Sequence, residues 1–270
     1  MPSLAQAPAP WPRTTPRVPP RKPIVPYVPT AESLVESMLD LAQVGPNDVL
    51  YDLGCGDGRI VIAAARRGAR GVGVDIDRLR VREGHWNADR AGVTDRVRFV
   101  RDSLYDVDLR PATVVTLFLL PSINKNLRPK LLRELRTGSR IVSNYFDMAD
   151  WPPDARNEAW GRLLYLWIVP AWVEGRWKCL MNAPDGRRHL TLNLTRQYQQ
   201  VTGTVQGDRR ETRVEAGRLS GDRFTLRFPD PATGVRLECE ATIGSSQLRG
   251  TARAAGDGAA PWPWCGWRRP

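Results

Sequence analysis

A cluster of three glycines is the feature of this sequence whose spacing most directly suggests chemistry. The glycines are Gly54, Gly56 and Gly58, and they follow a short apolar run at 49–53. Glycine adopts backbone angles that other residues avoid, and it lets a ligand lie against the main chain. We therefore expect a ligand over this turn, with Cys55 facing it through a backbone amide rather than through its thiol.

Three aspartates lie at or just after the ends of consecutive apolar runs. Asp52 precedes the glycines, and a carboxylate there suits a cationic amino group better than a pyrophosphate, which it would repel. Asp75 can accept hydrogen bonds from both hydroxyls of a ribose. Asp102 can accept a hydrogen bond from the amino group of an adenine. The predicted site also includes the next residues along the chain, Ile76 and Ser103.

The glycine spacing also bears on which nucleotide is bound. A dinucleotide fingerprint reads Gly-x-Gly-x-x-Gly, but Arg59 stands where the third glycine is needed and Gly58 comes one place early. This departure weakens the hypothesis of a dinucleotide oxidoreductase, which stays open as an alternative. Each of these residues also has a purely structural alternative to ligand binding. The glycines could form an ordinary strand-to-helix turn, Asp75 could cap a helix, and Asp102 could form a turn.

A parallel sheet would bring these residues together, and the middle of the chain predicts one. Short apolar runs alternate with helix-like stretches, which is typical of a sheet covered on both faces. The runs are 49–53, 71–75, 97–100, 113–120 and 140–146, and helices are expected at 60–67, 78–91 and 123–135. An earlier helix with apolar residues at 34, 35, 38, 39 and 42 should stop near Gly45. The prediction is a doubly wound, Rossmann-like α/β domain with its site at the carboxyl ends of the strands.

After residue 171 the period of the apolar residues changes to two. Inward positions are expected at 190, 192 and 194, at 224, 226 and 228, and at 235, 237, 239 and 241, with Cys239 in the core. This alternation, with glycine turns between the runs, predicts a small antiparallel β barrel or sandwich. We therefore predict a Pro-rich extended arm at 1–30, the α/β domain at 31–170 and an all-β domain of unknown role at 171–270.

Charge and composition narrow the possible functions. The net charge of +11 resides in the arm (+4) and in 171–270 (16 basic and 10 acidic residues, +6), whereas 31–170 carries 20 basic and 19 acidic residues. The basic regions leave nucleic acid open as a partner, although arginines spaced along strands more often form a solvated face. Four cysteines without a Cys-x-x-Cys pair and two histidines argue against metal catalysis. No apolar run is long enough to span a bilayer.

Over residues of about 24–165 the sequence resembles the class I S-adenosylmethionine-dependent methyltransferases. The resemblance rests on Asp-Leu-Gly-Cys-Gly-Asp-Gly at 52–58, with Asp75 and Asp102 in register. Val25-Pro-Tyr-Val-Pro-Thr30, Gly-Asp-Gly-Arg-Ile at 56–60, Phe146 and Trp151 look like the small protein-lysine methyltransferases of mitochondrial carriers and ATP synthase c subunits, and their bacterial relatives. Eukaryotic members of that group commonly carry Glu where this chain has Asp75.

The resemblance implies S-adenosylmethionine as cofactor and N-methylation of a protein lysine or another amine. Tyr27 and Thr30 would close over the methionine end of the cofactor, and Thr30 is also placed to cap the first helix. The residues Phe-Leu-Leu-Pro-Ser at 118–122 lack the Asp/Asn-Pro-Pro-aromatic pattern of nucleobase-amine methyltransferases, which disfavours methylation of a DNA or RNA base amine. A binding module without turnover, and a methyltransferase acting on a small molecule or RNA, stay open as alternatives.

Such an enzyme has mainly to align the acceptor with the methyl group and to exclude water. Tyr145 and Asp147 follow the fifth strand and are expected near the mouth of the site, but no catalytic base is predicted. A cytoplasmic location is predicted because S-adenosylmethionine is made and used in the cytosol. Ser3-Leu-Ala-Gln-Ala7-Pro is similar to the cleavage end of a secretory signal, so a trimmed precursor is the alternative.

Overall fold

The structure is a computed structural model and describes residues 26–256, 258 and 260–268. Most of the predicted arm at 1–30, and the signal-like stretch within it, therefore lies outside the described residues. Internal contacts divide the chain into two compact units. The first contains the described residues up to Leu135 with Val142–Phe146 and Asn157–Leu164, and the second contains Arg136–Ile141, Asp147–Arg156 and the chain from Tyr165 onward.

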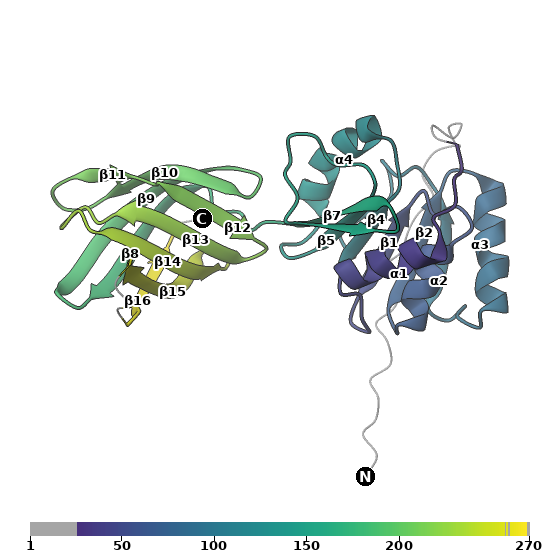
Figure 1. Cartoon of the computed structure of the whole chain (residues 1–270), viewed down its shortest axis with the longest axis horizontal. Coiled ribbons are helices and arrows are strands. Elements are labelled where there is room, and N and C mark those ends of the chain that lie inside the picture. The colour runs from purple at the N-terminus through teal and green to yellow at the C-terminus, as the bar shows by residue number, and fades with distance from the viewer. Residues whose placement is uncertain (1–25, 257, 259, 269–270) are drawn as a thin grey trace, which may run out of the picture. The chain divides into compact units, whose positions relative to one another are not determined.

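A seven-stranded sheet carries the predicted parallel strands. Its strands are β1 (Val49–Leu53), β2 (Arg70–Asp75), β3 (Val97–Arg101), β4 (Val114–Leu117), β5 (Arg140–Asn144), β6 (Ala155–Ala159) and β7 (Arg162–Ile168). They lie in the order β3-β2-β1-β4-β5-β7-β6 (Figure 1). Strand β1 pairs in parallel with β2 on one side and with β4 on the other. The direction of the strand order changes at this point, where open α/β sheets leave a crevice for a ligand.

Four helices accompany this sheet among the described residues: α1 (Glu32–Leu41), α2 (Arg59–Arg66), α3 (Arg78–Arg90) and α4 (Pro121–Glu134). Helix α2 packs closely on the strands, since a Cβ atom on Gly71 of β2 would lie 2.8 Å from the Val61 side chain. Helix α3 begins after Asp77, whose carboxylate accepts a hydrogen bond from the Leu79 N–H. Strands alternating with these helices confirm the predicted doubly wound α/β fold.

Several boundaries differ from prediction by one or more residues, and the structure explains three of these differences. Ala31 is the N-cap of α1 and no side-chain hydrogen bond caps this helix, so the prediction that Thr30 caps it is wrong. Strand β4 ends at Leu117, before the apolar run is complete, because α4 already begins at Pro121. Strand β5 ends at Asn144 because Tyr145 takes a φ of 70°, in the left-handed region, which breaks the extended backbone.

The hairpin of β6 and β7 was not predicted. Strand β6 reads Ala-Arg-Asn-Glu-Ala and has no buried residue, because it is the last strand of the sheet and faces solvent. The sequence signal for a strand was therefore missing. Trp160 and Gly161 form the two-residue turn to β7, with φ values of 53° and 69°.

The second unit contains a closed antiparallel barrel. Its strands are β8 (Gly175–Ala183), β9 (Gly186–Gln197), β10 (Gln200–Gln206), β12 (Ala216–Ser220), β13 (Arg223–Pro229), β14 (Arg236–Ile243), β15 (Gln247–Ala254) and β16 (Trp262–Trp267), while the short β11 (Glu211–Arg213) pairs with β10 outside the ring. Strand β9 pairs with both β8 and β10, and this pairing closes the ring. Of the two predicted alternatives, the barrel is confirmed and the sandwich is wrong.

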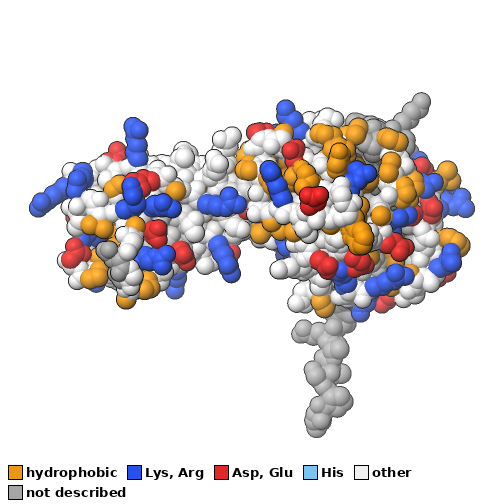
Figure 2. All heavy atoms as spheres, in the orientation of Figure 1, with side chains coloured by type: hydrophobic (Ala, Val, Ile, Leu, Met, Phe, Trp, Pro, Cys, Tyr) orange, Lys and Arg blue, Asp and Glu red, His pale blue; other side chains and the backbone are white. Residues whose placement is uncertain are grey.

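Large apolar side chains fill the inside of the barrel. Trp177, Met181, Phe224 and Phe228 are at most 1% exposed, and Cys239 is buried as predicted. Val235 was expected to face inward but is 47% exposed, because it precedes β14 and belongs to the turn. On the face shown in Figure 2, Lys and Arg side chains are scattered over this unit rather than gathered in one patch. Within the described part of the chain, no helix is long and apolar enough to cross a membrane.

Candidate functional site

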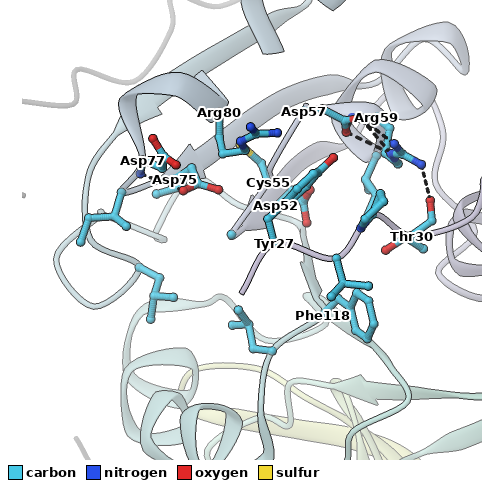
Figure 3. Close-up of a pocket in the computed structure, with 18 of the residues that line it drawn as sticks. Tyr27, Thr30, Asp52, Cys55, Asp57, Arg59, Asp75, Asp77, Arg80 and Phe118 are labelled. Atoms are coloured by element: carbon cyan, nitrogen blue, oxygen red, sulfur yellow. Dashed lines mark hydrogen bonds and ion pairs between the residues drawn. The ribbon is translucent and has the colours of Figure 1, made fainter. Parts of the chain in front are cut away.

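A cavity of about 310 Å³ opens at the carboxyl ends of β1, β2 and β4 in the first unit. Nine of the eleven predicted site residues line it, namely Tyr27, Thr30, Asp52, Gly54, Cys55, Asp75, Ile76, Asp102 and Ser103. The other two, Gly56 and Gly58, lie in the same turn but do not contribute to the wall. In Figure 3, Asp75 and Asp77 lie toward one end of the pocket and Thr30 and Phe118 toward the other, with Asp52, Cys55 and Tyr27 between them.

The backbone of the turn after β1 requires glycine at three positions. Gly54, Gly56 and Gly58 have φ values of 84°, 53° and 80°, which L side chains rarely adopt. A Cβ atom would also lie 3.1 Å from Leu119 Cδ2 at Gly54, and 2.3 Å from the Tyr27 ring at Gly56. At Gly58 it would meet the Phe99 ring. Gly54 therefore contributes to the wall of the cavity. Gly56 leaves space for the Tyr27 ring, and Gly58 leaves space for the Phe99 ring.

Asp52 is a buried carboxylate in the wall of the cavity. It is 3% exposed, and its Oδ1 accepts a hydrogen bond of 2.8 Å from the hydroxyl of Thr116 on β4. Burial raises the pKa of Asp52 to about 7. Burial disfavours the ionised form of this carboxyl, and a cation bound in the cavity would stabilise that form. The cationic amino group expected from the sequence is such a cation.

Asp75 joins the end of β2 to the glycine turn. Its Oδ2 accepts a hydrogen bond from the Gly56 N–H and its Oδ1 accepts one from the Asp77 N–H, both at 2.9 Å. Burial raises the pKa of this carboxyl. Each carboxylate oxygen has a further lone pair, so both can still accept from a ribose. The N-cap of α3 is Asp77, so the alternative that Asp75 only caps a helix is wrong, and Asp75 lines the cavity.

Asp102 and Ser103 form the wall after β3. The Asp102 carboxylate accepts a hydrogen bond of 2.7 Å from the Ser103 N–H, and burial raises its pKa. The Ser103 hydroxyl accepts a hydrogen bond of 3.2 Å from the Tyr105 N–H. These local hydrogen bonds stabilise a turn, so Asp102 has the turn-forming role that was its structural alternative. Its side chain also lines the same cavity as Asp75, as an adenine site requires.

A strap of residues, Pro26 to Thr30, covers part of the cavity. The Arg59 guanidinium donates a hydrogen bond of 2.7 Å to the Thr30 carbonyl and forms an ion pair of 2.6 Å with Asp57. Burial raises the pKa of Asp57, but the hydrogen bonds and charge of Arg59 outweigh it and the pKa is lowered overall. The Arg80 guanidinium lies 4.5 Å from the centroid of the Tyr27 ring.

Sequence reasoning missed several residues of this wall. Arg59 was noted only as an interruption of a glycine fingerprint, yet it ties the strap to the glycine turn. Asp57, Arg80, Tyr105 and Phe118 also line the cavity. Their positions follow from tertiary folding, and the signal available was the position of Phe118 directly after β4. Tyr145 belongs to this unit without lining the cavity, and Asp147 belongs to the second unit, where its Oδ1 accepts from the Ala149 N–H.

The described residues give little support to a cysteine nucleophile or to a metal ion. Cys55 is buried, and its pKa is raised well above the usual range, mainly by burial, so the thiol stays protonated. No group of three or more His, Cys, Asp or Glu side chains suited to a metal ion occurs in the described part of the chain. The cavity therefore offers carboxylate acceptors, glycine backbone and aromatic rings.

Comparison with known proteins identifies relatives over part of the chain. A model of the ANTKMT methyltransferase domain matches residues 52–155. A protein-lysine N-methyltransferase of Saccharolobus islandicus is 48% identical over 133 residues, which are 48% of this chain and 83% of that protein. The mouse adenine nucleotide translocase lysine N-methyltransferase is 40% identical over 132 residues, 48% of this chain and 57% of that protein. The chain thus spans little more than half of this animal relative.

A solved structure is also similar to part of the chain. The RNA methyltransferase from Salinibacter ruber, in complex with S-adenosyl-L-homocysteine, is 50% identical with a TM-score of 0.53. The match covers 54% of this chain and 96% of that chain. The reported relatives match about half of this chain, and the range matched by the family model includes the glycine turn, Asp75 and Asp102.

Proposed function

The chain belongs to the family of S-adenosylmethionine-dependent protein-lysine N-methyltransferases, and we propose that it methylates the side-chain amine of a lysine in a protein substrate. The observation that carries this proposal is a single cavity in which Asp52, Asp75 and Asp102 come together beside the glycine turn. Three carboxylates at the ends of β1, β2 and β3 match a ligand with a cationic amino group, a ribose and an adenine. The name of the archaeal relative supports protein lysine as the acceptor.

Each wall of the cavity then has a task. Asp52 would hold the amino group of the methionine moiety, Asp75 the ribose hydroxyls and Asp102 the adenine amino group. Ile76 and Leu104 would supply apolar contact to the purine, and Gly54 would let the ligand lie on the main chain. Tyr27 and Thr30 of the strap would cover the methionine end. In Figure 3, Tyr27 lies beside Asp52 and Thr30 lies at the end of the pocket away from Asp75, which supports this direction along the pocket.

S-adenosylmethionine supplies a methyl group that its sulfonium has already made electrophilic. The chain has therefore to position the acceptor amine in line and to keep water out. Phe118 and Leu119 line the wall after β4 and are apolar, so they disfavour the charged form of an approaching lysine. This helps because only the neutral amine is a nucleophile. The protonated thiol of Cys55 gives no reason to expect a covalent intermediate.

Methyl transfer to RNA is a second candidate. It is favoured by the name of the Salinibacter ruber protein, which is 50% identical to this chain. Against it, the residues after β4 are Phe118, Leu119 and Leu120, which have no side-chain acceptor for an exocyclic base amine. We therefore prefer lysine to an RNA base as the acceptor.

We also infer a cytoplasmic site of action, because S-adenosylmethionine is made and used in the cytosol.

The test is an assay of the full chain with methyl-labelled S-adenosylmethionine, supplied in parallel with the protein fraction and the RNA fraction of a lysate. We expect label in protein, located by mass spectrometry on a lysine, together with release of S-adenosylhomocysteine. Label confined to RNA would replace the first proposal by the second. Calorimetric binding of S-adenosylmethionine with no label in either fraction would instead indicate a binding module without turnover.

A further inference from the structure

Two large aromatic residues of the first unit are exposed on backbone that such residues rarely adopt. Tyr145 has a φ of 70° and is 45% exposed, and Trp160 has a φ of 53° and is 74% exposed. The left-handed region disfavours every residue with a Cβ atom. Strained positions that persist in a fold are concentrated at functional sites. Neither burial of the side chain nor the backbone preference of the residue type explains why aromatic residues occupy positions 145 and 160.

Both residues lie at the edge of the sheet where the cavity opens. Tyr145 directly follows β5, and its N–H donates a hydrogen bond of 2.7 Å to the carbonyl of Leu163 at the start of β7. Trp160 occupies the turn just before β7. Because β4 and β5 run in the same direction through the doubly wound sheet, the end of β5 lies at the same edge as the end of β4, where Phe118 lines the cavity.

An aromatic row connects this edge to the cavity. The ring of Phe118 stacks on that of Phe146, with centroids 6.3 Å apart and planes at 21°. The ring of Phe146 meets that of Tyr145 edge to face, with centroids 4.9 Å apart. One end of the row is therefore in the cavity wall and the other, Tyr145, is at the surface. Phe118, the inner end of the row, lies at the end of the pocket that also holds Thr30 (Figure 3).

The outer end of the row already attracts a cation. The guanidinium of Arg162 lies 4.8 Å from the centroid of the Tyr145 ring. Such a contact is favourable, because the face of an aromatic ring attracts a cation. Tyr145 keeps almost half of its surface exposed despite Arg162 and Phe146. A further side chain with an apolar stem and a cationic head can therefore pack on it.

A lysine side chain has this chemistry, since its methylenes are apolar and its amine is cationic until it enters a desolvated site. We propose that Tyr145 binds the acceptor lysine at the mouth of the site, and that the row Tyr145, Phe146 and Phe118 is the wall along which its methylenes lie. Trp160 and Leu163, which is 41% exposed, would contact the peptide on either side of the lysine. This inference rests on the proposed lysine methyltransferase function and adds to it a residue that recognises the acceptor.

The test uses a bisubstrate analogue, in which the methyl position of the cofactor carries a chain of the length of a lysine side chain ending in an amide. Its affinity for the full chain is compared by calorimetry with that of S-adenosylhomocysteine. We expect the analogue to bind about tenfold more tightly than S-adenosylhomocysteine. Tyr145→Ala should remove most of this gain and leave the affinity for S-adenosylhomocysteine within about twofold.

Trp86→Ala is the matched control. Trp86 is an exposed aromatic residue of the same unit, on α3, with the Arg90 guanidinium 4.6 Å from its ring. Its removal should leave both affinities unchanged. Tyr145→Gly is a second variant, because glycine accepts the backbone angle at this position. If Tyr145 serves recognition, this variant melts no lower than the wild type and still loses the gain in affinity.

The outcomes separate the two proposals. Failure of the wild type to bind S-adenosylhomocysteine would overturn the proposed function and this inference with it. Binding of S-adenosylhomocysteine without a gain for the analogue would overturn the aromatic wall alone. A gain that survives in Tyr145→Ala would overturn the role of Tyr145. Loss of both affinities together with a lower melting temperature would make Tyr145 a structural residue and overturn the inference.

Discussion

The hydroxyl of Thr116 donates a hydrogen bond of 2.8 Å to Oδ1 of Asp52 across the paired strands β4 and β1, where the two residues are in register. Burial raises the pKa of Asp52 to about 7, and this hydrogen bond opposes the rise. The carboxylate therefore changes its charge near neutral pH in the free protein. A cation bound in the cavity would shift it to the ionised form, which couples ligand affinity to pH.

The affinity for S-adenosylmethionine should therefore rise with pH up to about 7 and then level off. Below that pH, binding of the cationic amino group must displace a proton from Asp52, and affinity falls by up to about tenfold per pH unit. Calorimetry between pH 5.5 and pH 8.5, a range of about three units around this pKa, measures the profile. Asp52→Asn should weaken binding and flatten the profile, and an unchanged profile in this variant would contradict the role of Asp52.

Thr116→Val is predicted to move the same profile rather than remove it. The variant loses the hydrogen bond that lowers the pKa of Asp52, so the midpoint should shift to higher pH.

The free energy of unfolding of the protein without ligand should also depend on pH through Asp52. Because the pKa of Asp52 in the folded state lies above the usual 3.8, stability present at low pH is lost as the pH rises through about 7. Urea unfolding should show this loss, and Asp52→Asn should reduce it.

Gly56→Ala is predicted to weaken cofactor binding by displacing Tyr27. A Cβ atom at Gly56 would lie 2.3 Å from the Tyr27 ring, so the ring has to move away from the cavity. We expect affinity for S-adenosylmethionine to fall by about tenfold or more. Gly92→Ala is the control, because Gly92 has a similar φ of 66° with nothing within 4 Å of the added atom. Equal affinity in the two variants would mean that Tyr27 does not cover the ligand.

Arg59→Met is predicted to loosen the strap of residues 26–30. The variant loses the hydrogen bond to the Thr30 carbonyl and the ion pair with Asp57. Dissociation of S-adenosylmethionine, followed by stopped-flow fluorescence, should become about three- to tenfold faster. Arg67→Met is a matched control, since Arg67 pairs with Glu36 and Asp40 away from the cavity. Similar dissociation rates in both variants would show that the strap does not retain the ligand.

Much of the site could be predicted because it depends on local sequence. Glycine at positive φ and aspartate at the end of a strand leave a signal in the chain itself, so Gly54, Asp52 and Asp75 were found. Arg80 and Phe118 carry no such signal, because they reach the cavity only through the packing of α3 and β4. Strand β6 was missed for a related reason, since an exposed edge strand lacks the apolar alternation that identifies a strand.

Trp160→Asn is predicted to stabilise the fold. Two-residue turns with positive φ at both positions favour Asn-Gly, and here the pair is Trp160-Gly161 with φ values of 53° and 69°. We expect the free energy of unfolding to rise by about 0.5–1 kcal/mol, measured with urea. Trp86→Asn, an exposed position in the middle of α3, should not give this gain. Lower stability of Trp160→Asn would show that the tryptophan packs on its own unit.

Closure of the barrel between β9 and β10 limits how a partner can engage the second unit. A protein that binds by adding a strand needs a row of unpaired backbone N–H and C=O groups. In the described chain such rows remain at β3 and β6, the two margins of the seven-stranded sheet, and on the three-residue β11. A macromolecule that engages the ring of the barrel must therefore recognise side chains and turns, so its specificity resides in outward residues that can change without altering the packed interior.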